Sequence, residues 1–470
     1  MHFTLSISNQ GSKLHQNHNI LSILLLLGDI VGLVLALFFP FWINWEDNSQ
    51  VFEPVISLLF CLLIITGLYV ADSYHPDNQI SGLRAPARIL ITNMLVGGIF
   101  FAILHIMETG EKLALWKWEI LLPSLSISTI WTICLRVSTA KWARSQAQNR
   151  RWLILGANKQ AIQLGKIFLK HNTLGRLVIL AASDQHTHEL AKNHRISVSS
   201  LHDLRQWIYQ PWSGVVLATP TQLSDIEMQQ LMQLQVAGIP IYSIPDICEN
   251  LWYKLPSSLL QDNLLVFSAG YHLTSNSISQ KIKRVTDIIL ALLLFVGLFP
   301  LMLLTALAIK LNSPGPIFYS QVRTGLQGNT FRVYKFRSMY QDAEKRGVQW
   351  AHEHDPRITR VGRWLRLLRI DELPQIFNVL SGEMSLIGPR PERPEFDVKL
   401  RQEIPYYDLR YVVKPGITGW AQVMYPYGAS VEDADEKLAY DLYYIKNYSP
   451  FLDLAIAFKT IRVVLLGKGR

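Results

Sequence analysis

Two adjacent carboxylates, Asp371 and Glu372, stand where the sequence predicts the start of a helix. Pro374 fits the first turn of a helix and disfavours helical geometry at the residue before it, so it marks a break after the basic segment 362–370. The helix dipole stabilises carboxylates and phosphates alike at such a position. The acid pair is therefore either a catalytic pair beside a phosphate ligand or a pair of residues that only stabilises the helix.

Basic side chains that suit a phosphate ligand occur on both sides of the acid pair. Lys335 and Arg337 alternate with aromatic residues in the segment 331–339, and on a strand they would share one face. Arg390 stands between two prolines, which stiffen the backbone and reduce the entropy lost when the guanidinium grips a phosphate with two hydrogen bonds. These residues predict a phosphate-binding site, although a charged strand taken alone is usually just solvated.

An apolar run at residues 288–309 precedes these motifs and is interrupted at its middle by Pro300. A spanning helix kinked at the proline would place everything after it outside the cell. A re-entrant helix, which enters the membrane and returns, would keep both flanks on one side, with the proline as its break. Residues 281–370 hold three times as many Lys and Arg as Asp and Glu. Because such an excess is typical of the cytoplasmic face, we expect the re-entrant form.

Four further apolar runs, each long enough to cross a bilayer, lie nearer the N-terminus. They cover residues 20–43, 51–70, 89–106 and 120–135. Acidic residues occupy the first and third connecting loops, whereas Arg84 and Arg88 border the second and a basic stretch follows the fourth run. The positive-inside rule then places the N-terminus and everything after the fourth run in the cytoplasm. No small-residue cleavage site follows the first run, so we expect a retained helix rather than a signal peptide.

The segment 151–265 has a different pattern. Strand-like runs alternate with polar or helical stretches, which is typical of a parallel α/β sheet. The runs are 151–155, 177–182, 215–219 and 239–244. The turn 156–161 stands where a dinucleotide fingerprint would, but only its first glycine is present and Asn158 would obstruct the approach of a pyrophosphate. We expect a Rossmann-like domain without a bound cofactor, in a structural or regulatory role.

The composition favours a membrane protein with anionic partners. The 470 residues are 49% hydrophobic and carry a formal net charge of +9, and the basic residues stand beside apolar segments rather than in a separate tail. Phosphates and phospholipid headgroups therefore fit better as partners than nucleic acid does. The three cysteines lack the spacing of a disulfide framework or of a zinc site.

Eight short motifs after residue 281 carry a family resemblance. They follow one another in family order over about 190 residues, at 283–287, 313–318, 323–328, 334–339, 371–375, 384–391, 414–420 and 440–445. In these stretches the chain resembles the bacterial sugar transferase family, the monotopic polyprenyl-phosphate phosphoglycosyl transferases. Its front half resembles that of the long members, which add four membrane helices and a nucleotide-binding-like domain. At one position it departs from them, because Phe299 precedes Pro300 where the family often carries serine.

The resemblance implies transfer of a sugar 1-phosphate from a UDP-sugar to polyprenyl (undecaprenyl) phosphate, which starts exopolysaccharide, capsule or O-antigen synthesis. Asp371 would attack the sugar-bearing phosphate, release UMP and form an aspartyl-phosphosugar, which polyprenyl phosphate then attacks. Glu372 would hold Mg²⁺, the implied cofactor, while Arg366 and Arg390 would contact phosphate. An aspartate with an ordinary pKa is ionised at neutral pH, so the nucleophile would need no general base.

The expected fold class is a membrane bundle of four α-helices, a cytoplasmic α/β Rossmann-like domain and a mainly α (α+β) catalytic domain with a re-entrant membrane helix. The expected boundaries are 1–18 for a cytoplasmic segment, 19–145 for the bundle, 146–275 for the Rossmann-like domain, 281–470 for the catalytic domain and 286–311 for the re-entrant helix. We expect a multi-pass homodimer in the bacterial inner membrane, in contact with membrane lipid, a UDP-sugar and polyprenyl phosphate.

Two other functions fit the same residues. One is a membrane glycosyltransferase that moves the sugar without its phosphate and releases UDP. The other is a non-enzymatic scaffold for polysaccharide assembly, in which the acid pair is structural. The identity of the released nucleotide separates the first alternative from the leading hypothesis, and the effect of removing an acid separates the second.

Overall fold

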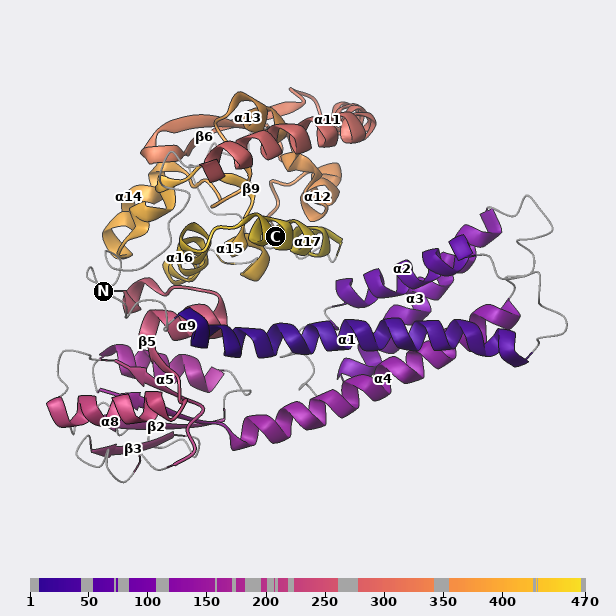
Figure 1. Cartoon of the computed structure of the whole chain (residues 1–470). Coiled ribbons are helices and arrows are strands. Elements are labelled where there is room, and N and C mark those ends of the chain that lie inside the picture. Colours follow the sequence, from indigo (N-terminus) through magenta and orange to yellow (C-terminus); the bar gives the residue numbers. More distant parts are fainter. Residues whose placement is uncertain are drawn as a thin grey trace. The chain divides into compact units, whose positions relative to one another are not determined.

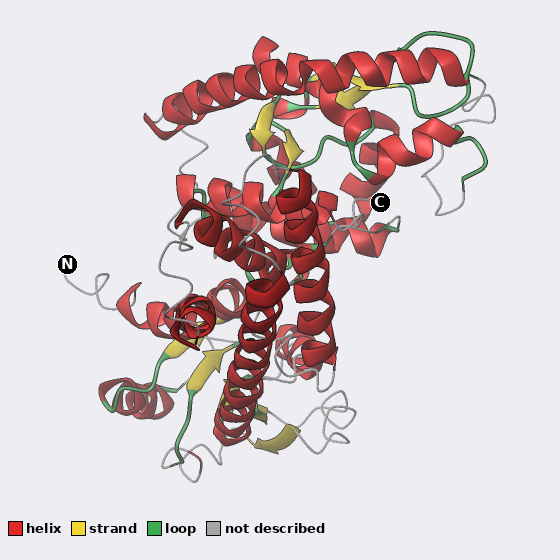
Figure 2. Cartoon of the chain, turned by 90° about the vertical axis from the view of Figure 1, so that its right-hand side faces the viewer, coloured by secondary structure: helices red, strands yellow, loops and turns green. Residues whose placement is uncertain are grey.

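The computed structural model divides into two compact units, Met1–Leu251 and Trp252–Arg470, and helices make up most of the described chain (Figures 1 and 2). It describes residues 8–43, 54–71, 73–74, 84–106, 118–156, 159–170, 175–181, 196–200, 207, 210–218, 224–260, 278–341, 355–425, 428 and 430–465.

The first unit contains the four expected apolar helices, which are α1 (Ser8–Ile43), α2 (Pro54–Val70), α3 (Arg84–Ile106) and α4 (Trp118–Asn149). Apolar stretches of at least 18 residues, enough to cross a membrane, lie in α1, α3 and α4, and α2 is an apolar helix of 17 residues. The helices pack through buried side chains such as Phe60 and Phe100, whose rings meet edge to face. The acidic loops that set the predicted topology lie outside the described residues.

One buried ion pair joins the two long helices of this bundle. Arg136 of α4 binds both carboxylate oxygens of Asp29 on α1, and Thr132 also donates to Asp29, at 3.2 Å. A charge inside an apolar bundle is costly unless it is paired, and removing one partner would leave the other uncompensated. The pair therefore fixes how α1 and α4 pack along each other (Figure 1).

The first unit also holds a five-stranded parallel sheet, which confirms the predicted α/β segment. Its strands lie in the order β3-β2-β1-β4-β5. They are β1 (Arg151–Leu155), β2 (Arg176–Ala181), β3 (Ile196–Ser200), β4 (Gly214–Leu217) and β5 (Ile241–Ser243), with helices α5 (Lys159–Lys170), α8 (Asp225–Val236) and α9 (Ile244–Trp252). The sequence did not predict β3, because its residues alternate only two apolar side chains with serines. Asn158, expected to obstruct a pyrophosphate, lies outside the described residues.

The second unit surrounds two small sheets with helices. Its elements are η5 (Ser257–Leu259), α11 (Ile278–Asn312), β6 (Phe318–Thr324), η6 (Leu326–Gly328), β7 (Thr330–Phe336), α12 (Arg360–Leu367), η7 (Ile370–Gln375), α13 (Ile376–Ser381), β8 (Ser385–Ile387), α14 (Pro394–Glu403), η8 (Tyr407–Val412), β9 (Gly416–Thr418), α15 (Trp420–Met424), α16 (Val431–Lys446) and α17 (Pro450–Leu465). Strands β6 and β7 form an antiparallel hairpin, and β8 pairs with β9 in parallel. Leu255 and Leu260 pack into a core with α16 and η8, so residues 252–260 belong to this unit.

Helix α11 includes the predicted re-entrant segment, but it continues through Pro300 as one helix, so the predicted break at that proline is absent. Its buried side chains recur at helical spacing and lie on one face of the helix between residues 287 and 309; they are Asp287, Ala291, Met302, Thr305 and Ile309. Most of its exposed side chains are apolar, Val296 and Leu304 among them. A helix of this kind offers one face to protein and the rest to an apolar medium.

Candidate active site

The acid pair lies on a short 3₁₀ segment rather than at the start of an α-helix. Helix α12 ends at Leu367, Arg369 turns the chain with φ 54°, and η7 carries both acids in its first turn. Pro374 lies inside η7, and α13 begins only at Ile376. The predicted break is present, but the prediction that the proline opens the second helix is wrong, because a 3₁₀ turn tolerates proline here and delays the α-helix by two residues.

Asn378 of α13 fixes the neighbouring strand to this segment. Its amide donates to the Arg332 carbonyl at 2.7 Å and accepts from the Tyr334 N–H at 3.2 Å. The side chain is fully buried, so it fixes β7 beside the helix that follows the acid pair. Lys335, the next residue of β7, thereby reaches Glu372, and its Nζ lies 2.9 Å from Oε1.

Arg390 reaches the same carboxylate from the loop after β8. Gly388 and Gly416 let two backbones approach closely, since a Cβ at either would collide with the backbone opposite. The Gly416 N–H donates to the Pro389 carbonyl at 2.9 Å. Two motifs far apart in sequence, 388–391 and 414–420, therefore form one rigid turn that presents the arginine.

Glu372 is buried and bound by cations. Arg390 donates to Oε1 at 2.6 Å and to Oε2 at 3.3 Å, Lys335 also donates to Oε1, and Arg369 lies 3.6 Å from Oε2. Burial alone would raise the pKa of Glu372, but the charges of Arg390, Lys335 and Arg369 outweigh it and hold that pKa well below its usual range. Glu372 is thus a permanent anion that gathers three cations.

Asp371 is buried to a similar degree, with 7% of its surface exposed, yet its carboxylate makes no hydrogen bond or ion pair within the described part of the chain. Burial, and then the neighbouring charge of Glu372, raise the pKa of Asp371 to about 6, against the opposing charges of Lys335, Arg366 and Arg390. The expectation of an ordinary pKa is therefore corrected. The group is still mainly ionised at pH 7, and it is less well solvated than a surface carboxylate.

The structure brings most of the predicted phosphate-binding residues together, but Arg337 binds elsewhere. Lys335 and Arg390 contact Glu372 directly, and Arg366 of α12 lies close enough for its charge to act on Asp371. The buried guanidinium of Arg337 instead donates to the carbonyls of Ser313 and Pro314, at 2.7 and 2.8 Å. Arg337 thus holds the loop after α11.

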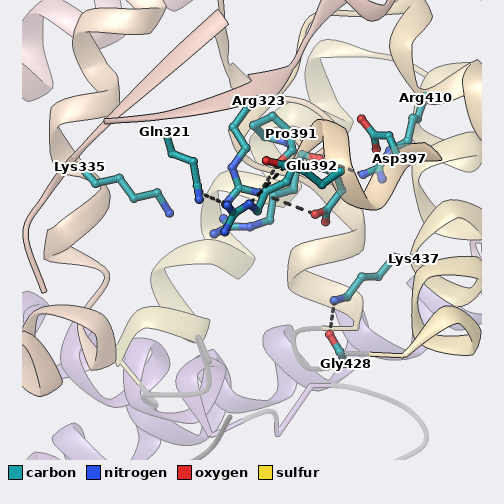
Figure 3. A network of polar contacts seen from close by, with 12 residues as sticks. Gln321, Arg323, Lys335, Pro391, Glu392, Asp397, Arg410, Gly428 and Lys437 are labelled. Atoms are coloured by element: carbon teal, nitrogen blue, oxygen red, sulfur yellow. Dashed lines mark hydrogen bonds and ion pairs between the residues drawn. The ribbon is translucent and has the colours of Figure 1, made fainter. Parts of the chain in front are cut away.

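The sequence did not reveal three further arginines. Arg369 contacts Glu372 as described above. Arg323 of β6 donates to Gln321 at 2.7 Å and to the Pro391 carbonyl at 3.2 Å (Figure 3). Arg410 is buried and donates to the Arg390 carbonyl at 2.8 Å, to Asp441 at 3.1 Å and to the Tyr407 hydroxyl at 2.6 Å. Two of the three positions carried a signal in the sequence, since Arg369 stands two residues before Asp371 and Arg323 opens the motif 323–328. Arg410 carried none.

The described residues supply few metal ligands. No group of three or more His, Cys, Asp or Glu side chains within them lies close enough to share an ion. Mg²⁺ is nevertheless often held by one or two carboxylates when phosphates and water complete its ligands. Both oxygens of Glu372 already face cations, whereas those of Asp371 accept no hydrogen bond from a described residue. The acid pair therefore fits Mg²⁺ only together with the phosphates of a bound substrate.

This arrangement suits chemistry at a phosphorus atom. The positive charges of Lys335, Arg366, Arg369 and Arg390 outnumber the two acids, so the site has an excess of cations for a doubly or triply charged ligand. The one carboxylate that no cation binds, Asp371, is the group left to act as a nucleophile.

Residues 278–467 match the family model described as bacterial sugar transferase. The chain is 48% identical over 239 residues to the UDP-N-acetylgalactosamine-undecaprenyl-phosphate N-acetylgalactosaminephosphotransferase of Aeromonas hydrophila, which covers 51% of this chain and 55% of that protein. It is 32% identical over 441 residues to the UDP-glucose:undecaprenyl-phosphate glucose-1-phosphate transferase of Escherichia coli, which covers 91% of this chain and 92% of that protein.

A third relative matches a shorter stretch of the chain. The UDP-glucose:undecaprenyl-phosphate glucose-1-phosphate transferase of Caulobacter vibrioides is 45% identical over 185 residues, which cover 39% of this chain and 69% of that protein. The names of the three relatives differ in the sugar, so the likeness does not identify the sugar that this chain would use.

Proposed function

Because the chain belongs to the bacterial sugar transferase family, we propose that it transfers a sugar 1-phosphate from a UDP-sugar to undecaprenyl phosphate and releases UMP. The observation that carries this proposal is the contrast between two adjacent buried carboxylates. Glu372 binds three cations, while Asp371 accepts no hydrogen bond from a described residue. A structural pair would leave neither acid unbound.

In the first step a carboxylate oxygen of Asp371 attacks the phosphorus that carries the sugar. A bond forms between that oxygen and the phosphorus, and the phosphorus–oxygen bond to the second phosphate breaks, so that UMP leaves. Lys335, Arg366 and Arg390 bind the phosphate oxygens and stabilise their charge as the bond changes. Asp371 needs no proton acceptor, since it is mainly ionised at neutral pH.

In the second step an oxygen of undecaprenyl phosphate attacks the same phosphorus. The phosphorus–oxygen bond to Asp371 breaks, and the aspartate returns as a carboxylate. Glu372 keeps its negative charge throughout, because its low pKa prevents protonation. It thereby holds Arg390 and Lys335 in place between the two half-reactions.

Glu372, together with the substrate phosphates, would hold Mg²⁺. The ion would supply additional neutralisation of the diphosphate charge. The other tasks, which are binding, orienting and attacking, belong to the protein side chains described above.

The contacts of α11 support a re-entrant rather than a spanning helix. Near its start, Asp287 accepts from the Ser385 hydroxyl at 2.7 Å. Near its end, Met302 and Ile309 pack with Phe336 and Leu365. Both halves contact one compact unit, which can lie on only one side of the membrane. We place that unit on the cytoplasmic side of the inner membrane, because an excess of Lys and Arg residues is typical of that side.

The strand order of the parallel sheet in the first unit, 3-2-1-4-5, matches the first five strands of the order 3-2-1-4-5-6 found in dinucleotide-binding folds. We propose a structural or regulatory role for it without a bound nucleotide. Its first turn has a single glycine, Gly156, with φ 113°, where a dinucleotide fingerprint needs three.

The proposal is tested by the variant Asp371→Asn in the full chain, incubated with a UDP-sugar and undecaprenyl phosphate. We expect UMP release to be abolished, because an amide cannot form the acyl phosphate. Asp408→Asn makes the same change at an exposed carboxylate bound to Arg401 and should leave the rate unchanged. Undiminished UMP release by Asp371→Asn would refute the mechanism.

The same incubation separates the two alternatives. A glycosyltransferase that moves the sugar without its phosphate would release UDP from the unmodified chain. A scaffold in which the acids are structural would leave sugar-lipid synthesis unaffected in Glu372→Gln, whereas we expect that variant to lose it because Lys335, Arg369 and Arg390 lose their common anion.

A further inference from the structure

A cavity of about 460 Å³ lies in the second unit at the N-terminal end of α11, apart from the acid pair. Its lining combines basic with apolar side chains. The basic residues are Lys281, Lys283, Arg284 and Lys414, and the apolar ones include Val285, Leu326, Ile387, Val412 and Val413. A ligand that fits such a lining carries both negative charge and hydrocarbon.

The cavity and the nucleophile lie at opposite ends of α13. Arg284 donates to the carbonyls of Val379 and Leu380, at 2.6 and 3.0 Å, near the C-terminal end of that helix. Asp371 precedes the N-terminal end. Six helical residues rise about 9 Å, so a molecule in the cavity is held a helix length away from the reacting phosphorus.

Two of the four cations are already used by the fold. Arg284 binds the helix carbonyls, and Lys283 lies 2.8 Å from Asp453 with its ammonium over the ring of Tyr448. These contacts stabilise a helix C-terminus and join α11 to α17. They leave Lys414 and Lys281 as the cations available to a ligand.

Among the residues that the structure describes, none forms a hydrogen bond or an ion pair with the Lys414 side chain, which lies beside Arg284. A Cβ on Gly382 would be 3.3 Å from a guanidinium nitrogen of Arg284 and 3.8 Å from Nζ of Lys414. Burial first, and then the charge of Arg284, lower the pKa of Lys414, while Asp287 opposes them in part. An anion would relieve this repulsion between like charges.

The surroundings of the cavity are apolar on two sides. From Val285 onward α11 exposes apolar side chains, and α17 exposes Phe451, Leu454, Phe458 and Ile461 along one face. The Lys283–Asp453 ion pair brings the starts of these two helices together beside the cavity. Amphipathic helices with such faces lie at the boundary of a bilayer, where lipid phosphates are found.

We propose that this cavity binds the phosphate of a membrane lipid, with Lys414 as its contact to the phosphate and the apolar lining against the adjoining carbons. The inference rests on the proposed insertion of α11 into the membrane. Two kinds of lipid share this chemistry, bulk anionic phospholipid and the polyprenyl phosphate acceptor. Either would be held apart from Asp371 without reacting.

The test is lipid retention by the purified full chain, measured by native mass spectrometry after separate additions of phosphatidylglycerol, undecaprenyl phosphate and diacylglycerol. We expect the unmodified chain to retain a phosphate lipid and Lys414→Gln to bind it roughly tenfold more weakly, the loss expected for one charge-assisted hydrogen bond. Lys414→Arg should retain binding. Lys310→Gln removes an exposed lysine at the other end of α11 and should bind as the unmodified chain does.

The lipid that the chain retains identifies the ligand of the cavity. Retention of phosphatidylglycerol alone identifies bulk phospholipid, retention of undecaprenyl phosphate alone identifies the acceptor, and retention of both supports a shared phosphate site. Equal binding by Lys414→Gln, or equal retention of phosphate-free diacylglycerol, would overturn the proposal. No sugar donor is added, and Asp371→Asn should retain lipid normally, so failure here is distinct from failure of the proposed transfer.

Discussion

The acid pair divides its tasks because the two carboxylates have different neighbours. Three cations surround Glu372 and lower its pKa. Burial and the neighbouring negative charge of Glu372 instead raise the pKa of Asp371. Two adjacent residues thereby become a permanent anion that organises the site and an ionisable group that can react. Pairs of titratable groups whose surroundings shift their pKa values in opposite directions are a recurring feature of enzyme sites.

The raised pKa of Asp371 predicts a pH dependence. The rate of UMP release in the first turnover should rise as the pH passes through about 6 and then level off, because only the ionised carboxylate attacks. Rapid-quench measurement of UMP across this range checks it. A rate that falls with rising pH, or stays flat, would contradict the assignment.

The same raised pKa predicts that the carboxyl group of Asp371 stabilises the fold less as the pH rises, whereas the rate of UMP release should increase. A carboxyl group whose folded pKa is raised stabilises the fold at pH values below its unfolded pKa, near 3.8, and this contribution is lost as the pH rises through about 6. Asp371→Asn should therefore raise the melting temperature more at alkaline than at acidic pH. Nearly equal effects at both would mean that the carboxyl is not destabilised by its surroundings.

Arg410 positions Arg390 without touching substrate. It holds the Arg390 carbonyl and is itself held by Asp441 and Tyr407. Lysine cannot make this fork of bonds, so Arg410→Lys should lower kcat/KM for the UDP-sugar about tenfold through misplacement of Arg390. Arg401→Lys, at an exposed arginine bound to Asp408, is the matched control. If Arg410→Lys lowers only the melting temperature and leaves the rate per folded molecule intact, the role is merely structural.

Sequence motifs predicted the residues that gather around the acid pair better than those that hold them in place. Asp371, Glu372, Lys335, Arg366 and Arg390 come together as predicted. Arg337, in the same motif as Lys335, instead binds carbonyls of the loop after α11. The roles of Asn378 and Arg410 arise from tertiary contacts between distant segments, and no local pattern encodes such contacts.

At the level of helices and strands, the hydropathy pattern predicted the elements whose apolar residues recur with a clear period. The four apolar helices and strand β1 lie where expected, since their patterns are long or distinct. The polar residues 8–19 continue α1 beyond the apolar run, and the 3₁₀ form of η7 was not foreseen, because neither feature changes the hydrophobic pattern.

Labelling of α11 from either side tests its path. With the native cysteines replaced, single cysteines at Ile278 and Leu311, both strongly exposed, should react with a membrane-impermeant maleimide in inverted vesicles and not in spheroplasts. A re-entrant helix keeps both ends on the cytoplasmic side, whereas a spanning helix separates them. Asn48→Cys, in the loop predicted to face outward, supplies the opposite pattern as a control. Labelling of Leu311→Cys from outside would establish a spanning helix.

At the scale of the molecule, the two units have separate cores, and all the site residues lie in the second. The homodimer remains a prediction. Residues 252–470 expressed alone should release UMP at a rate of the same order as the full chain, because α11 supplies their membrane contact. Complete loss of activity in a folded, membrane-bound 252–470 fragment would show that the first unit contributes to catalysis.

In the proposed mechanism a covalent bond to Asp371 carries the sugar phosphate between donor and acceptor. Mass spectrometry can detect this bond in peptides from the full chain, quenched with acid after incubation with a UDP-sugar in the absence of undecaprenyl phosphate. We expect a sugar-phosphate adduct on Asp371, formed together with an equal amount of UMP and lost on addition of the lipid. Release of UDP with no adduct, or an adduct on another residue, would contradict it.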